Sequence, residues 1–123
     1  METKGVRIKS STGDQSIKVI ELSGKIDTIT TDKISQEVMG VFEQNPGGLL
    51  FNLHEVTFVS SAGLRMFLSA YKKGAAADIK MAMCHVHPSV YKIFKVGGLE
   101  TAFKIFNDEP QALKEVWGIE IGG

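Results

Sequence analysis

The chain has 123 residues, of which 43% are apolar and 23% charged, and its fourteen basic side chains balance fourteen acidic ones. This profile is typical of one soluble globular domain and excludes an intrinsically disordered chain. The neutral balance gives no bulk electrostatic basis for binding nucleic acid or an anionic membrane. The single cysteine excludes an internal disulfide framework. With no apolar run near the roughly 20 residues that span a bilayer and no signal sequence, we expect a single cytoplasmic domain over residues 1–123.

The first part of the chain predicts two strands and a helix. Short apolar runs predict strands over Val6–Ile8 and Ile17–Leu22, separated by a polar turn. A loop rich in threonine and aspartate follows. The 3.6-residue spacing of apolar side chains then predicts a helix over residues 33–44, with Thr31 or Asp32 as its N-cap.

The central part repeats this alternation. The nearly continuous apolar run Leu49–Leu53 predicts a strand that is buried on both faces. A helical pattern runs from Ala62 to Lys73, with one apolar stripe through Leu64 and Phe67. The run Ile79–Cys84 predicts another strand.

The last part predicts two more helices around a final strand. Pro88 suits the first turn of a short helix that ends at Lys95. Phe103–Phe106 predicts the last strand, and a terminal helix starts at Asp108 or Glu109 and ends near Trp117. Strands joined through helices predict an α/β sheet with parallel pairs and helices packed against it.

Two adjacent serines, Ser60 and Ser61, stand where a strand-like run stops and a helix-like run begins. One serine is enough to cap a helix. The second serine is therefore either incidental or a site of chemical modification. Ser60 could take the capping role, which would leave Ser61 exposed.

Four segments, in this order and spacing, resemble the STAS domain, the fold of bacterial anti-sigma factor antagonists. They are G-K-I-D-T at Gly24–Thr28, L-F-N-L-H-E-V-T-F-V at Leu50–Val59, S-S-A-G-L-R at Ser60–Arg65, and V-Y-K-I-F-K-V-G-G-L at Val90–Leu99. The resemblance is best over about residues 17–117. It implies a single STAS-type α/β domain with a mixed four- to five-stranded sheet and helices packed mainly on one face.

The resemblance also implies a modification site. The family's site usually reads Asp-Ser-Ser-Gly or Asp-Ser-Ala-Gly, and its first serine accepts a phosphoryl group. Aligned on Gly63, that acceptor is Ser61; Ser60 stands in place of the aspartate and is the alternative acceptor. Arg65, four residues after Ser61, is either a phosphate contact or a solvated surface charge. Asn52 also departs from the family's commoner aspartate.

By this resemblance the protein is a regulatory binding module and not an enzyme, and it needs no cofactor. Its implied partners are an anti-sigma factor that is a serine kinase of the histidine-kinase-like ATPase fold, and a metal-dependent serine phosphatase. The unphosphorylated protein would sequester the kinase, and phosphorylation of Ser61 would end the complex. Alternatives are an unphosphorylated STAS subunit of another assembly, such as a lipid-transport ATPase, a small-ligand sensor, or a signalling output that does not involve a sigma factor.

The predicted partner-binding residues lie around Asp27 and at the start of the second helix. Asp27 is either a turn aspartate that bonds its own backbone or a contact for the partner. Apolar residues in a loop suit partner contact, and an exposed methionine suits an adaptable interface, but core packing is the alternative for Ile26, Ile29 and Met66. The full set is Ile26, Asp27, Thr28, Ile29, Ser60, Ala62, Arg65 and Met66.

The segment Cys84–His87 reads C-H-V-H, which raises the question of a metal site. His85 and His87 would share one face of a strand. There is no second cysteine, and the only other histidine is His54. We therefore interpret these residues as strand-end histidines and predict no metal.

Overall fold

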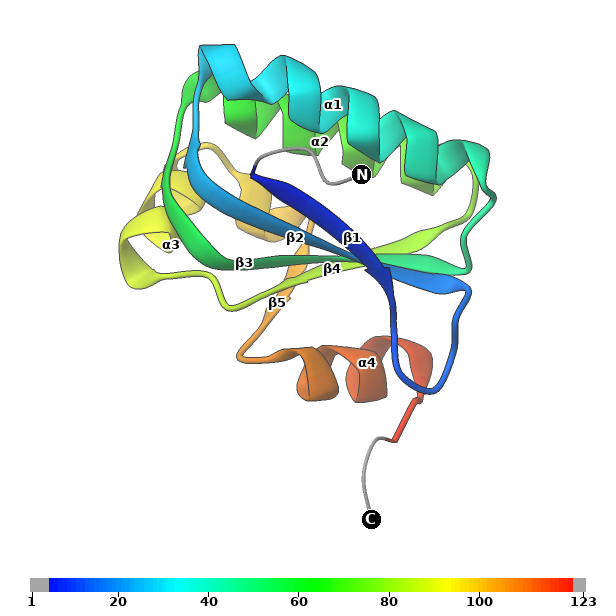
Figure 1. Ribbon diagram of the computed structural model, residues 1–123. Coiled ribbons are helices and arrows are strands. Elements are labelled where there is room, and N and C mark those ends of the chain that lie inside the picture. Colours follow the sequence, from blue (N-terminus) through cyan, green and yellow to red (C-terminus); the bar gives the residue numbers. More distant parts are fainter. Residues whose placement is uncertain (1–4, 121–123) are drawn as a thin grey trace.

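The computed structural model describes residues 5–120 and shows one mixed β-sheet with helices on both faces (Figure 1). The sheet order follows the sequence: β1 (Val6–Ser10), β2 (Ile17–Ile26), β3 (Gly48–Val59), β4 (Lys80–Cys84) and β5 (Lys104–Phe106). β1 and β2 form an antiparallel hairpin, and every other neighbouring pair is parallel. The connections contain α1 (Thr28–Glu43), α2 (Ser61–Ala76), α3 (Pro88–Val96) and the 3₁₀ turn η1 (Leu99–Thr101), and α4 (Glu109–Trp117) follows the last strand.

The position of each helix follows from the strand order. Crossovers between parallel strands are almost always right-handed, and the three crossovers here all step to the next strand in the same direction. They therefore put α1, α2 and α3 on one face of the sheet, whereas α4 lies on the opposite face (Figure 1). This confirms the predicted α/β class, the mixed sheet and the helices packed mainly on one face.

β3 separates two apolar cores, as its prediction as a doubly buried strand requires. On one face Phe51 packs edge to face against Phe67 of α2, with 5.4 Å between ring centroids, and Phe67 packs against Phe94 of α3 at 5.9 Å. On the other face Leu50 belongs to a smaller core that includes Leu113 of α4. The larger core therefore holds three helices on the sheet.

The start of α1 corrects the predicted helix over 33–44. The helix begins at Thr28, and its N-cap is Asp27. The side chain of Asp27 accepts from the backbone N–H of Thr30, while the hydroxyl of Thr30 accepts from the N–H of Asp27, which makes a capping box. The predicted caps, Thr31 and Asp32, lie inside the helix because this earlier pair satisfies the first turn.

β2 is longer than predicted, ending at Ile26 instead of Leu22. Its pairing with β3 shifts register twice, between Glu21 and Ser23 and between Gly24 and Lys25. Gly24 has a φ of +80°, a conformation that glycine adopts without steric cost and that is common at bulges. The strand bends at these shifts and continues, so β2 and β3 end side by side. Across residues 5–120, no helix combines the length and apolarity needed to cross a bilayer.

Candidate functional site

Two helices start next to each other at one edge of the sheet. Ile26 and Val59, the last residues of β2 and β3, are paired in register. The backbone N–H of Ser60 donates a 2.8 Å hydrogen bond to the carbonyl of Ile26, which ties the start of α2 to the end of β2. Asp27 and Ser60 each directly follow one of these strands, and each is the N-cap of a helix.

The Asp27 carboxylate is bound to its own helix. Its Oδ1 accepts from the backbone N–H groups of Ile29 at 2.9 Å and Thr30 at 3.0 Å. The hydrogen bond from the Thr30 N–H is the largest influence on this carboxyl and lowers its pKa below the ordinary value. Asp27 therefore carries a negative charge at neutral pH. Its bonding to its own backbone is confirmed, and its contact with a partner stays a prediction.

Ser60 and Ser61 have different roles at the start of α2. The half-buried Ser60 accepts from the backbone N–H of Gly63 through its Oγ at 3.2 Å, so it caps the helix. Ser61 is the first residue of the helix, and it is exposed. This confirms the expected division between the two serines and leaves the hydroxyl of Ser61 accessible for modification.

Gly63 allows α2 to approach the strand ends closely. A Cβ at this position would lie 2.8 Å from Cγ1 of Val59 and 2.9 Å from Cγ2 of Ile26. Real Cβ contacts are essentially never this short, so a side chain here would push the helix away. Because Gly63 has no side chain, the start of α2, which carries Ser61, can lie close to the ends of β2 and β3.

Four of the predicted contact residues lie on or near the surface around this edge. Thr28, Arg65 and Ile29 are exposed, and Ile29, a large apolar side chain, is 82% exposed. Ala62 is half-buried. Arg65 lies one helical turn after Ser61 on the same helix, as its spacing requires.

The prediction that Ile26 and Met66 contact a partner is wrong, because both side chains are buried in the core. Ile26 belongs to β2 instead of a loop, and its side chain has no exposed surface. Met66 is only 6% exposed because the buried stripe of α2 runs through Gly63, Met66 and Phe67, one position away from the predicted stripe. For both residues the alternative explanation, core packing, is the correct one.

Two exposed apolar residues near Ser61 were not among the predicted contact residues. Phe58, at the end of β3, is 43% exposed, and Val96, at the end of α3, is 91% exposed. Both line a groove that also contains Ser61. The sequence held a signal for one of them: Val96 does not follow the four-residue spacing of the buried Val90 and Phe94.

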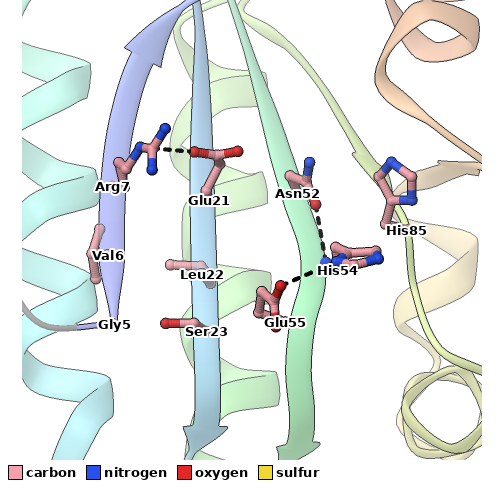
Figure 2. Close-up of a pocket in the computed structure, with 10 residues that line it drawn as sticks. All are labelled: Gly5, Val6, Arg7, Glu21, Leu22, Ser23, Asn52, His54, Glu55 and His85. Carbon is pink, nitrogen blue, oxygen red and sulfur yellow. Dashed lines mark hydrogen bonds and ion pairs between the residues drawn. The ribbon is translucent and has the colours of Figure 1, made fainter.

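The sheet face opposite α1 and α2 has a polar hollow of about 710 Å³. Arg7, Glu21 and Asn52, from three neighbouring strands, form a row across it (Figure 2). His54 lies further along β3, and His85 is the residue after β4 (Figure 2). An ion pair of 3.2 Å joins Nε of Arg7 to Oε1 of Glu21. This hollow faces away from the helices that carry the predicted contact residues.

The three histidines of the chain meet beside this hollow. The ring centroid of His54 lies 5.2 Å from that of His85 and 6.0 Å from that of His87. The predicted strand face for His85 and His87 is wrong, since β4 ends at Cys84 and His85 has a left-handed φ of 57°. Within the described part of the chain, no three histidine, cysteine or acidic side chains are arranged to hold a metal ion.

Comparison with known proteins identifies the fold family. A model of the STAS domain matches residues 9–112. The chain belongs to the STAS domain family. It is 26% identical over 103 residues to the anti-sigma F factor antagonist of Paenibacillus polymyxa, and the match covers 83% of this chain and 88% of that protein.

Two solved structures share the fold of this STAS domain. The anti-sigma factor antagonist SpoIIAA in its unphosphorylated form aligns with a TM-score of 0.78 at 21% identity, covering 94% of this chain and 99% of that one. The Bacillus cell fate determinant SpoIIAA in its phosphorylated form aligns with a TM-score of 0.69 at 20% identity, covering 90% and 98%. At these identities the likeness establishes the architecture of the domain.

Proposed function

We propose that this STAS protein is an anti-sigma factor antagonist, controlled by phosphorylation of Ser61. In its unmodified form it binds an anti-sigma factor that is also an ATP-dependent serine kinase, which frees the sigma factor. The kinase transfers the γ-phosphoryl group of ATP to Oγ of Ser61, ADP leaves, and the complex dissociates. A metal-dependent serine phosphatase hydrolyses the phosphoester and restores the binding form. The exchange takes place in the cytoplasm, and the protein itself catalyses no reaction.

The observation that carries this proposal is that the two adjacent serines differ: Ser60 is the N-cap of α2, and Ser61 is exposed at the start of the helix. A helix N-terminus presents unpaired N–H groups and partial positive charge, which favour an attached phosphate. Modification therefore needs no rearrangement of the fold.

Phosphorylation would act on binding through charge. A phosphoserine adds about −1.5 to −2 charges at neutral pH, at the same sheet edge as the exposed Ile29 and the ionised Asp27. Repulsion and desolvation of a few kcal/mol would weaken association by two to three decades, since about 1.4 kcal/mol is tenfold. Several relatives are named anti-sigma factor antagonists, among them the protein of Paenibacillus polymyxa, and these names support the choice of partner.

The test is phosphopeptide mapping after incubation with the candidate anti-sigma factor and Mg-ATP. We expect label on Ser61 in the wild type and in Ser60→Ala, and none in Ser61→Ala. Label on Ser60, or on neither serine, would contradict the proposed site. Affinity capture with wild type and Ser61→Asp in parallel then identifies the partner, because the anti-sigma factor should be lost only from the Asp variant. Capture of transporter subunits by both forms would favour the alternative of a STAS subunit in another assembly.

A further inference from the structure

A groove of about 460 Å³ runs from the start of α2 to one side of α3, and we call it the α2–α3 groove. Ser61 lies at its α2 end, so the proposed modification site is part of its wall. The side chains that matter for its chemistry are Phe58, Ser61, Leu64, Lys92, Ile93 and Val96.

The groove is apolar although it is open to solvent. Leu64 and Ile93 are half-buried, whereas Phe58 is 43% and Val96 91% exposed. Covering any of these side chains would lower the free energy of the system, because burial of apolar surface is favourable. A single exposed apolar residue is ordinary, but several around one depression mark a contact surface.

The two helices beside the groove carry charges of one sign. Arg65 lies in the first turns of α2, Lys92 and Lys95 belong to α3, and neither helix contains an aspartate or glutamate. This asymmetry occurs in a chain whose acidic and basic residues balance overall. Among the described residues that line the groove, Lys92 is the charged one. A partner that complements this surface is apolar at its centre and acidic at its margin.

We propose that the α2–α3 groove binds an acidic amphipathic segment of the partner protein. An apolar side chain of that segment covers Val96 and Phe58. The carboxylates of the segment pair with Lys92 and Lys95. This inference rests on the proposed function in taking the partner to be the anti-sigma factor. It also gives the phosphorylation a specific target: a phosphate on Ser61 adds negative charge to the groove wall, where it repels the partner's carboxylates and competes for Lys92.

The first test measures binding affinity by calorimetry, with the anti-sigma factor that phosphorylates Ser61 in the mapping experiment. We expect Lys92→Glu to weaken binding about tenfold or more, Lys92→Gln to weaken it less, and Lys92→Arg to change it by less than about twofold, since the effect follows charge. Val96→Ser should weaken binding by about fivefold, because it removes apolar contact area. Lys114→Glu is the matched control, since Lys114 is exposed on α4, on the opposite face. Thermal unfolding of each variant checks that the fold is intact.

The outcomes separate this inference from the proposed function. If the wild type binds and Ser61→Asp does not, but Lys92→Glu and Val96→Ser bind as the wild type does, the groove is not the contact and the proposed function stands. Tighter binding by Lys92→Glu would show a basic partner segment and overturn the inference. If no anti-sigma factor binds the wild type, the proposed function fails. A second measurement then tests whether the groove binds an acidic amphipathic segment.

The second measurement uses synthetic probes and the full chain labelled with ¹⁵N. Two helical peptides of equal length are compared, one of leucine and glutamate and the other of leucine and lysine, together with a short DNA duplex. We expect the leucine–glutamate peptide to shift the amide signals of Ser61, Leu64 and Val96, with little shift in Val96→Ser. Equal shifts with both peptides, larger shifts with DNA, or no shift in these residues would refute the proposed chemistry.

Discussion

The side-chain Nδ2 of Asn52 donates a 2.6 Å hydrogen bond to Oε2 of Glu109, which lies 57 residues later in the chain. The other side-chain atom of Asn52, Oδ1, accepts from the backbone N–H of His54 at 2.9 Å. The second oxygen of Glu109 pairs with Nζ of Lys9 at 3.3 Å. A nearly buried amide on β3 therefore joins the start of α4 to the sheet, at the position where the family commonly has an aspartate. An aspartate here would place two carboxylates in contact, so the asparagine suits its neighbour Glu109.

Replacing this amide should destabilise the fold. We expect Asn52→Ala to lower the free energy of unfolding by about 1–3 kcal/mol, because it leaves a partly buried acceptor on Glu109 without its donor. Urea denaturation measures this change. Asn107→Ala is the control, since Asn107 is exposed, and its effect should be within about 0.5 kcal/mol. Equal stability of Asn52→Ala and wild type would show that the hydrogen bond contributes nothing.

The two serines should differ in their contribution to stability. Ser60→Ala removes the N-cap of α2 and should cost about 1 kcal/mol. Ser61→Ala removes an exposed hydroxyl and should change stability by less than about 0.5 kcal/mol, although it abolishes the proposed phosphorylation. Urea denaturation of both variants gives the comparison, and the reverse order of stabilities would mean that Ser61 is the cap.

Two glycine-to-alanine changes should have opposite signs. Gly63→Ala should destabilise the protein by about 1–3 kcal/mol, because the new methyl group would overlap Val59 and Ile26 in a packed region. At Gly40 of α1 a Cβ would meet no atom within 4 Å, so Gly40→Ala should stabilise the helix by roughly 0.5–1 kcal/mol. Thermal or urea unfolding measures both. A neutral Gly63→Ala would show that α2 can move away from the strand ends.

Asp27 should give part of the protein's stability a dependence on pH. Its pKa in the folded protein lies below the ordinary value of 3.8, mainly through the hydrogen bond from the Thr30 N–H. A lowered folded-state pKa stabilises the fold above the unfolded-state value, and this contribution is lost as the pH falls through the folded-state pKa. The stability advantage of wild type over Asp27→Asn should therefore be constant near neutral pH and shrink below 3.8. Urea titrations at several pH values test this, and an advantage that persists in strong acid would contradict it.

Cys84 should be chemically inert in the folded protein. Its side chain is fully buried in the smaller core, and burial raises the pKa of its thiol to about 12. Because the thiolate is the reactive form, iodoacetamide should not label the native protein and should label it fully in urea. Mass spectrometry reads the result without ambiguity, since the chain has one cysteine. Rapid labelling under native conditions would mean that α4 opens readily from the sheet.

Local patterns in the sequence were enough to predict the order of strands and helices and the capping role of Ser60. Strand and helix periodicity are set by neighbouring residues, as is the preference of serine for a helix start. The capping box of Asp27 and Thr30 is also local, since the two residues are three positions apart. Because this pair satisfies the first turn, α1 begins at Thr28, before the predicted caps Thr31 and Asp32. The fold family was predicted from the resemblance of four short motifs, in their order, to the STAS domain.

Only the tertiary structure decided which of the predicted contact residues reach the surface. Ile26 and Met66 are buried because two register shifts extend β2 and because α2 is rotated by one position relative to its apparent stripe. The α2–α3 groove brings together segments that are distant in the chain, and the hydrogen bond between Asn52 and Glu109 spans 57 residues. The periodicity of one segment says which side chains share a face, and the packing of distant segments decides whether that face is covered.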